Sequence, residues 1–237
     1  MASTDRDPKR APANGPGSEN PSEPPQVVKA QTGRVLGPRA LKTRERLLAA
    51  TADLLRERGA LDLSVVEIAR RAGTSTATFY QYFGDVEEAA LSLAQQAARE
   101  MPPLPELIDG PWEDEEGLET ARKIVRAFLR HWETHRAVLL IRNLAADHGD
   151  PRFQEARRAA LLPFLDRLAE CVAGFQPSDG PGAQLHPFAA AAAIVSILER
   201  LSAHPRELAQ RGVSQEVLLD TCALILHQVV TGGGSRR

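Results

Sequence analysis

The chain has 237 residues, of which 43% are hydrophobic, 25% charged and 5% aromatic, and its formal net charge is −2. These values are typical of a globular protein that is long enough to bury a sizeable core. No apolar run approaches the roughly 18 residues of a membrane span, and the Pro-rich N-terminal segment lacks a signal-peptide core. We therefore exclude a membrane partner and expect a cytoplasmic protein.

Charge is unevenly distributed along the chain. Residues 1–33 carry four basic and four acidic side chains, residues 34–84 carry nine and five, and residues 85–237 carry 16 and 22. A basic block followed by an acidic body suggests that one end meets a polyanion, although an excess of this size also occurs on ordinary protein surfaces.

Residues 1–33 contain six prolines and almost no apolar periodicity. Such a segment cannot bury enough surface to offset the entropy of ordering, so the sequence predicts a disordered tail. Its basic residues suit either phosphate contacts or a solvated linker, and the composition favours the linker. These residues are Lys9, Arg10, Lys29 and the adjoining Arg34.

A helix is expected over Pro38–Arg58. Proline suits the first turn of a helix, Leu41, Leu48 and Leu55 recur at heptad spacing, and a glycine follows the last turn.

Two short helices joined by a tight turn are expected next. Ser64 and the glutamate three residues later have the spacing of a capping box, and this first short helix ends at Gly73. Ser75 offers an N-cap to the second helix, on which Phe79 and Phe83 form an i, i+4 apolar pair. The arrangement predicts a helix-turn-helix.

Asp85 and Glu88 form a second capping box, which opens a helix that reaches about Glu100 before two prolines stop it. The rest of the chain shows helical periodicity and no strand-like alternation, so we predict an all-α fold of about nine helices. The remaining expected helices are Glu115–Thr134, His135–Ala146, Pro151–Gly174, Pro187–Ala203 and Ser214–Thr231.

One stretch resembles the DNA-binding domain of TetR-family transcriptional regulators: Ser64 to Phe83, with its Ala-Gly-x-Ser turn and its Tyr-x-Tyr-Phe ending. The resemblance extends over about Leu41 to Leu93. It implies an N-terminal three-helix helix-turn-helix domain with a linking helix over residues 34–100. A helical ligand-binding and dimerisation domain would follow over residues 101–237.

The resemblance also implies roles for the second short helix and its surroundings. The groups that would read base edges are Thr76, Ala77 and Gln81. The groups that would hold the DNA backbone are Ser64, Thr78, Tyr80 and Tyr82. Short side chains at the start of a helix and hydrogen-bonding groups along its exposed face suit the major groove, whereas the alternative is that the tyrosines merely pack.

The sequence departs from the family pattern at the start of the next helix. Many members have a phosphate-binding lysine there, and this chain has Val86. We predict that Lys42, Arg44 or the basic residues before Pro38 replace this contact with the phosphates.

The last two expected helices are strongly apolar. The resemblance implies that they form a homodimer interface with a second copy, and the alternative is an intramolecular core. A dimer would place two recognition helices about 34–36 Å apart, the spacing of successive major grooves in a palindromic site. The apolar residues are Phe188, Ile194, Val195, Ile197, Leu198 and Leu201, and Val217, Leu218, Cys222, Ile225, Leu226 and Val229.

Several residues on the four helices before the last suit a mostly apolar pocket for a small effector. Plain core packing is the alternative for these residues. They are Phe128, Trp132, Leu140, Asn143, Phe164 and Phe188, with Arg142 and His131 as polar anchors.

No motif predicts catalysis, a cofactor or a metal site. His131 and His135 have the i, i+4 spacing of zinc ligands, but the glutamate that zinc hydrolases place after the first histidine is lacking. A helix break expected near His135 further weakens that geometry. Cys171 and Cys222 lie in apolar helical stretches and are expected to be buried thiols.

The sequence therefore predicts a DNA-binding regulator that acts as a repressor, rather than an enzyme or a helical interaction module. Its partners would be double-stranded operator DNA, a second copy of the chain and a small, mostly hydrophobic effector that releases the DNA. The alternative is an activator, or a regulator that a protein partner controls.

Overall fold

The computed structural model describes residues 31, 33, 35–58, 63–175 and 185–232. Within these residues the chain forms ten helices and no strand, which confirms the all-α prediction. Apart from Gln31 and Gly33, the predicted tail lies outside the described residues. The helices are α1 Pro38–Arg58, α2 Val65–Arg71, α3 Thr76–Tyr82, α4 Val86–Arg99, α5 Leu104–Ile108, α6 Asp114–Asp147, α7 Pro151–Phe175, α8 Pro187–Ala203, α9 Pro205–Ala209 and α10 Gln215–Thr231.

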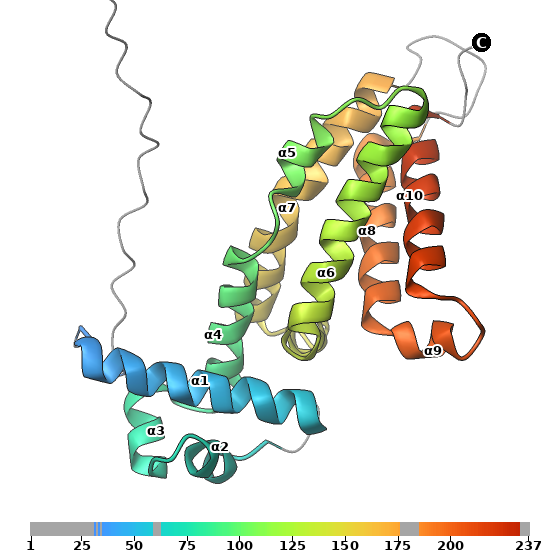
Figure 1. The fold of residues 1–237 in the computed structure, drawn as a ribbon. Coiled ribbons are helices and arrows are strands. Elements are labelled where there is room, and N and C mark those ends of the chain that lie inside the picture. The colour runs from blue at the N-terminus through green and yellow to red at the C-terminus, as the bar shows by residue number, and fades with distance from the viewer. Residues whose placement is uncertain (1–30, 32, 34, 59–62, 176–184, 233–237) are drawn as a thin grey trace, which may run out of the picture.

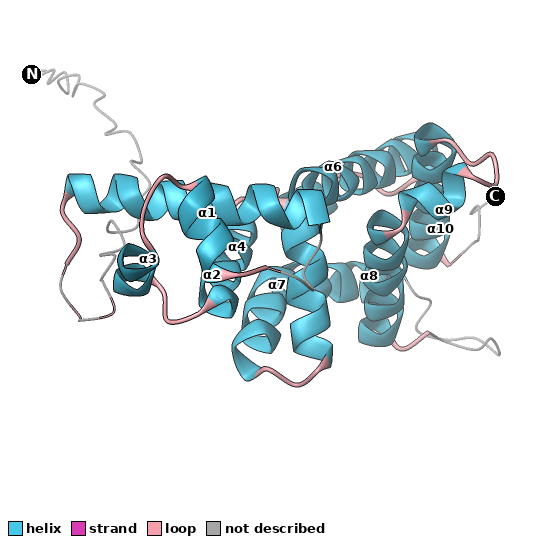
Figure 2. Cartoon of the chain, turned by 90° about the horizontal axis from the view of Figure 1, so that it is seen from below, coloured by secondary structure: helices cyan, strands magenta, loops and turns pink. Residues whose placement is uncertain are grey.

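The first three helices form a small unit at one end of the molecule, and α4 leads from it into a larger helical body (Figure 1). The long helices α6, α7, α8 and α10 make up this body, and the short α9 connects α8 to α10. Figure 2 shows the same arrangement from the side on which α2 and α3 lie. The unit of α1, α2 and α3 therefore lies at the opposite end from α5 and the last turns of α10.

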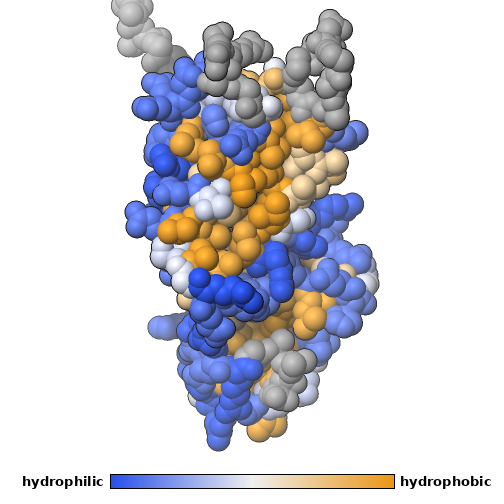
Figure 3. All heavy atoms as spheres, turned by 90° about the vertical axis from the view of Figure 1, so that its right-hand side faces the viewer, coloured by the Kyte–Doolittle hydropathy of each residue, from blue (hydrophilic) through white to orange (hydrophobic). Residues whose placement is uncertain are grey.

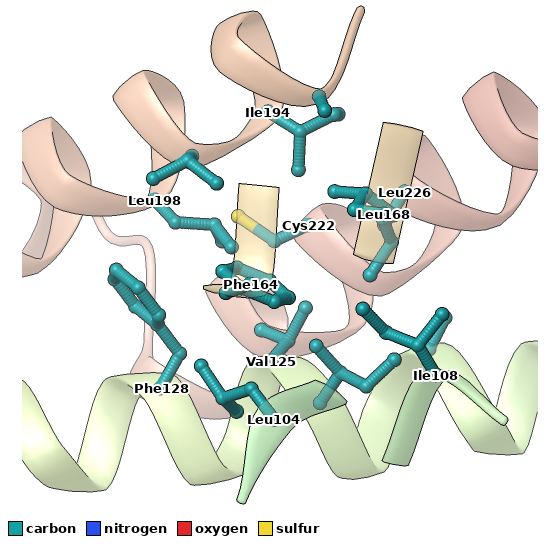
Figure 4. Packing of buried hydrophobic residues seen from close by; sticks show 14 of the residues in the cluster. Leu104, Ile108, Val125, Phe128, Phe164, Leu168, Ile194, Leu198, Cys222 and Leu226 are labelled. Carbon is teal, nitrogen blue, oxygen red and sulfur yellow. The ribbon is translucent and has the colours of Figure 1, made fainter. Parts of the chain in front are cut away.

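Two main apolar clusters correspond to these two parts. The N-terminal cluster includes the buried residues Leu47, Leu54, Leu55, Ile68, Phe79, Phe83, Leu93 and Val138. The C-terminal cluster includes Leu104, Val125, Phe128, Trp132, Phe164, Leu168, Ile194, Leu198, Cys222 and Leu226, most of which Figure 4 shows. Each fully buried large side chain contributes about 1.5–3 kcal/mol, so these clusters hold the helices in their relative positions.

The N-terminal and C-terminal parts meet along the later turns of α6. Val138 belongs to the N-terminal cluster, and Ile141 packs against both that cluster and a small third cluster of Ala90, Ala146 and Phe153. One segment of α6 therefore contacts both α4 and α1.

The predicted break near His135 is wrong, because α6 is one continuous helix of 34 residues. The helix changes direction, however, so that its last turns are seen end-on in Figure 1. Thr134 Oγ1 donates to the carbonyl of Arg130 at 3.0 Å, and such bonds to the preceding turn often bend helices. Neither glycine nor proline interrupts the sequence at this point, so nothing there ends the helix.

Two short helices were not predicted from the sequence. α5 and α9 span five residues each, and each has a proline in its first turn. Helices of this length have too few apolar positions to show a 3.6-residue period in the sequence. Their stability depends on tertiary packing rather than on a local signal.

His131 is buried where α6 packs near the end of α4. Its ring lies 4.8 Å from that of His135, whose Nε2 is 3.1 Å from Glu100 Oε2. Burial, followed by the charges of His135 and Arg142, lowers the pKa of His131 to about 4, against the opposing effect of Glu100. His131 is therefore neutral in the folded protein at neutral pH.

We expect the free energy of unfolding to fall as the pH is lowered from about 6.5 toward 4. The unfolded chain binds a proton at His131 near pH 6.5, whereas the folded chain does so only near pH 4, so acid favours unfolding in this window. One such proton contributes at most about 1.4 kcal/mol per pH unit. Urea titrations of His131→Phe should show a smaller pH slope than the wild type, and His148→Gln, at an exposed histidine, should not. An unchanged slope in His131→Phe would contradict this assignment.

Candidate nucleic-acid interface

Ion pairs and a buried phenylalanine hold α1, α2 and α3 together, and these three helices form the frame of the interface. Arg71 of α2 donates through both terminal nitrogens to Glu57 of α1, each at 2.8 Å, and Arg58 contacts Glu67 at 2.5 Å. Phe79 is completely buried on α3. These contacts fix α2 and α3 against α1, so that one face of α3 points away from the protein.

The turn between α2 and α3 depends on a left-handed glycine. Gly73 has φ of +64°, a conformation in which a Cβ is unfavourable. The N–H of Thr74 donates to Ala69 at 2.9 Å, which closes the end of α2. Ser75 then accepts from the N–H of Thr78 at 3.1 Å and starts α3, as predicted.

The outer face of α3 brings together the predicted base-reading residues. Thr76, Ala77 and Gln81 are exposed, and Tyr80 between them is 53% exposed. The ring of Tyr80 meets Phe79 edge-on at 5.8 Å, so its position is supported from within the frame. This face combines short side chains with hydrogen-bonding groups and is free of apolar bulk apart from the tyrosine ring.

Other predicted DNA contacts have structural roles as well. Ser64 Oγ accepts from the N–H of Glu67 at 3.3 Å, and the backbone N–H of Ser64 donates to the Glu67 carboxylate at 3.3 Å, so the capping box is present. Thr78 Oγ1 lies 3.0 Å from Ser75 Oγ. Tyr82 is half-buried and packs against the N-terminal cluster.

The two basic residues predicted to replace the missing lysine lie in different surroundings. Lys42 is exposed on α1. Arg44 is half-buried: its guanidinium donates to Ser92 Oγ at 3.1 Å and lies over the ring of Phe83, 5.1 Å from its centroid. Burial, followed by the charge of Arg99, lowers the pKa of Arg44. Val86 itself packs against the N-terminal cluster, which explains why an apolar residue is tolerated there.

One contact at the end of α3 has no signal in the sequence. The backbone N–H of Gln31 donates to the carbonyl of Gln81 at 3.1 Å, and its side-chain amide donates to Glu88 at 2.5 Å. The segment before α1 therefore meets the C-terminal end of α3 at Gln31.

A broad apolar surface covers the side of the body that α8 and α10 form (Figure 3). The structure divides the predicted interface residues into two sets. Those that face inward and belong to the C-terminal cluster are Ile194, Val195, Leu198, Leu218, Cys222 and Leu226. The others are less buried: Phe188, Ile197 and Val217 are exposed, and Leu201, Ile225 and Val229 are partly buried against the same cluster. The outward face also contains residues that were not predicted from the sequence, which lie at helical spacing from Ile197 and Val217: Ala189 and Ala193 of α8, and Thr221 and Leu224 of α10. Ile197 is 39% exposed, Val217 53% and Leu224 46%, which is unusual for large aliphatic side chains.

The structure does not bring the predicted pocket residues together around one cavity. Phe128, Trp132 and Phe164 are buried in the C-terminal cluster, with the Phe128 and Phe164 rings 6.2 Å apart. Leu140 is 38% exposed on α6, and Phe188 is 43% exposed on α8. The sequence pattern could not separate core from pocket because both use apolar side chains.

Arg142 and Asn143, predicted as polar pocket residues, meet Glu199 of α8 instead. Arg142 Nη2 donates to Glu199 Oε1 at 3.0 Å, and the amide of Asn143 donates to the same oxygen at 3.1 Å. Arg157 of α7 donates to the other carboxylate oxygen. Arg142 is 1% exposed and Glu199 is 4% exposed, so the network links three helices inside the protein.

The arginines of this network stay charged. Burial, opposed by Glu199, lowers the pKa of Arg142 to about 10, which still leaves it protonated at neutral pH. Burial also acts to lower the pKa of Arg157, but the hydrogen bond and charge of Glu199 raise it above its usual value. The cluster thus holds two cations against one buried carboxylate.

A groove of about 510 Å³ runs between α7 and α8 beside this network. One wall carries Leu161, Leu162 and Leu165 of α7, and the other carries Phe188, Ala192 and Val195 of α8. Arg157 and Glu199 line it as well. Neither charged residue was predicted from the sequence; the available signal was that Glu199 lies beside Val195 and Leu198 on the buried side of α8.

In the part of the chain that is described, no three His, Cys, Asp or Glu side chains gather as a metal site would require. None of the described helices is long and apolar enough to cross a membrane.

An exposed helix held on a rigid three-helix frame, with a larger helical body behind it, defines a helix-turn-helix DNA-binding protein. Residues 47–91 match the family described as bacterial regulatory proteins, tetR family, and residues 104–237 match the tetracyclin repressor-like C-terminal domain. The chain therefore belongs to the TetR family of transcriptional regulators.

Solved structures show the same fold at low sequence identity. The fatty acid degradation regulator FadR of Bacillus halodurans is 18% identical with a TM-score of 0.56, and the match covers 86% of this chain and all of that one (100%). FadR of Bacillus subtilis in complex with stearoyl-CoA is 16% identical, TM-score 0.56, with coverage of 79% and 98%. PfmR of Thermus thermophilus is 20% identical, TM-score 0.55, with coverage of 81% and 100%. No curated protein matches the sequence.

Proposed function

We propose that the protein is a repressor that binds palindromic operator DNA as a homodimer and releases it when a small, mostly hydrophobic effector binds. Residues 34–100 form the DNA-binding domain with its linking helix, and residues 101–237 form the effector-binding and dimerisation domain. The observation that carries the proposal is the outward face of α3, where Thr76, Ala77, Tyr80 and Gln81 are exposed together on a fixed frame.

On the DNA, α3 enters the major groove by its N-terminal end. Thr76, Ala77 and Gln81 face base edges, because short side chains at this end let the helix approach closely. The phosphate contacts come from Tyr80, Thr78 and Tyr82 on α3, from Ser64 at the start of α2, and from Lys42 on α1. Arg44 contributes by holding α1 against α4 rather than by direct contact, since its guanidinium is already bonded to Ser92.

The dimer forms through the outward faces of α8 and α10. Three large aliphatic side chains, Ile197, Val217 and Leu224, are exposed there, and the alanines at 189 and 193 allow close helix approach. Such a contiguous apolar surface is typical of a protein–protein interface. The two recognition helices are then presented to successive major grooves.

Effector binding and DNA binding are linked by the domain geometry. A ligand that prefers a different spacing of the two recognition helices weakens DNA binding, to the extent of its differential affinity for the two states. The neighbour from B. subtilis, which was solved in complex with stearoyl-CoA, supports the proposal of a hydrophobic effector.

Fluorescence anisotropy with labelled DNA from upstream of the protein's own gene tests the proposal. We expect specific binding that weakens with salt, and Tyr80→Ala should lower the affinity by about tenfold because a phosphate contact and its support are lost. Gln81→Ala should instead relax base preference at one position of each half-site. Arg126→Ala, an exposed change on α6, is the matched control and should leave binding unchanged. Absence of specific binding, or equal binding by Tyr80→Ala, would refute the proposal.

A further inference from the structure

The ion network beside the α7–α8 groove has unsatisfied hydrogen-bond donors. Among the described residues, nothing accepts from Arg142 Nη1 or from Arg157 Nε, although both atoms are buried. A buried donor without an acceptor costs free energy, most of all on a charged group. Inside the protein two arginines thus face one buried carboxylate, and the second carboxylate near Arg157, that of Asp147, is exposed.

We propose that the α7–α8 groove is the effector site and that it binds an amphipathic carboxylate, a molecule with one anionic head and an aliphatic tail. The head accepts hydrogen bonds from Arg157 at the Glu199 end of the groove. The tail lies along the wall formed by Leu161, Leu162 and Leu165 and the facing Phe188. The inference rests on the proposed function for its regulatory consequence, but not for the binding itself.

The charge and the shape of the groove favour a ligand with an anionic head and an aliphatic tail. A cation would be repelled by the two arginines, and a neutral head would leave the excess positive charge uncompensated. Asp147, the other carboxylate near Arg157, is 3.8 Å from Nη1 and 72% exposed, so water already solvates it and it competes weakly. The groove volume of about 510 Å³ is in the range of small-molecule sites, and its walls are mainly aliphatic.

The network also connects the groove to both ends of the regulator. Arg142 follows Ile141 on α6, and Ile141 packs against the N-terminal cluster and against the cluster of Ala90 and Phe153. Glu199 lies on α8, one of the two helices of the proposed dimer surface. A carboxylate bound to Arg157 shares this guanidinium with Glu199, which alters the contacts of Glu199 with Arg142 on α6.

Isothermal titration calorimetry of the full chain with decanoate, in the absence of DNA, tests the site. Decanol and decyltrimethylammonium serve as neutral and cationic comparators of equal chain length. We expect decanoate to bind, and the comparators to bind at least about tenfold more weakly, because hydrogen bonds to a charged partner are lost. Equal binding of decanol, or no binding of decanoate, would overturn the proposal.

Two pairs of variants locate the site. Arg157→Gln should weaken decanoate binding about tenfold, whereas Arg152→Gln, at an exposed arginine on the same helix, should not. Leu162→Glu should abolish binding by placing a carboxylate in the apolar wall, and Leu144→Glu, an equally exposed leucine outside the groove, is its control. Circular dichroism melts show which variants are folded, and a folded Leu162→Glu that still binds decanoate would exclude the groove.

A second copy covering the groove is the competing occupant. If Leu162→Glu turns a dimer into a monomer while decanoate binding persists, the groove is part of the dimer interface and the proposal fails. Release of operator DNA by decanoate is then measured separately by anisotropy. Binding of decanoate without any DNA binding would uphold the site and refute the proposed function, so the two failures are distinguishable.

Discussion

With Leu224 replaced by glutamate, the protein is expected to sediment as a monomer and to lose affinity for a palindromic operator by a factor on the order of 10² to 10⁴. Leu224 is 46% exposed at the centre of the outward face of α10. In a dimer, the carboxylate would be removed from water without a partner, at a cost that exceeds what the remaining contacts supply. The loss of affinity follows because a monomer holds only one half-site.

Sedimentation velocity and anisotropy on the same samples measure the two effects together. Leu144→Glu is the matched control, since Leu144 is 44% exposed on α6 outside both α8 and α10. This control should remain a dimer and bind the operator normally. A Leu224→Glu variant that stays dimeric would place the interface elsewhere, and one that is monomeric yet binds the operator with unchanged affinity would show that dimerisation is not required.

The DNA-proximal helices could be predicted closely because their signals are local. Ser64 starts α2, the left-handed Gly73 follows its last turn, and Ser75 starts α3, and each of the three acts within four residues of itself. Asp85 likewise accepts from the N–H of Glu88 at 2.7 Å and starts α4. The predicted second half of that capping box differs: the Glu88 carboxylate accepts from the N–H of Gly84 at 2.7 Å.

The body of the protein could be predicted less well, because its important contacts join residues far apart in the sequence. Apolar periodicity identified the long helices but could not show which apolar residues form the core and which line a groove. The network of Arg142, Arg157 and Glu199 joins three helices, and only the position of Glu199 beside apolar residues of α8 marks it in the sequence. The bend in α6 was predicted as a break because the sequence does not reveal whether a change of direction interrupts the hydrogen bonds.

Glu199→Ala is expected to lower the free energy of unfolding by about 3–5 kcal/mol, because it leaves the charge of Arg142 buried without its partner. Arg142 is 1% exposed, and its Nη2 lies 3.0 Å from Glu199 Oε1. Among the described residues, Glu199 is the only carboxylate that forms an ion pair with Arg142. Asn143 would lose the acceptor of its amide at the same time. Urea unfolding followed by circular dichroism at neutral pH measures the effect.

The double variant Arg142→Leu with Glu199→Leu tests whether the unpaired charge of Arg142 causes the loss of stability. Replacing both charges by aliphatic side chains removes the desolvation cost together with the attraction, so the double variant should be more stable than Glu199→Ala. Asp220→Ala removes an exposed ion pair with Arg122 at 2.9 Å and should cost less than about 1 kcal/mol. If Glu199→Ala cost no more than Asp220→Ala, water would have to reach Arg142 in the folded protein. In that case the groove end would be solvated, and an anionic head would gain little from binding there.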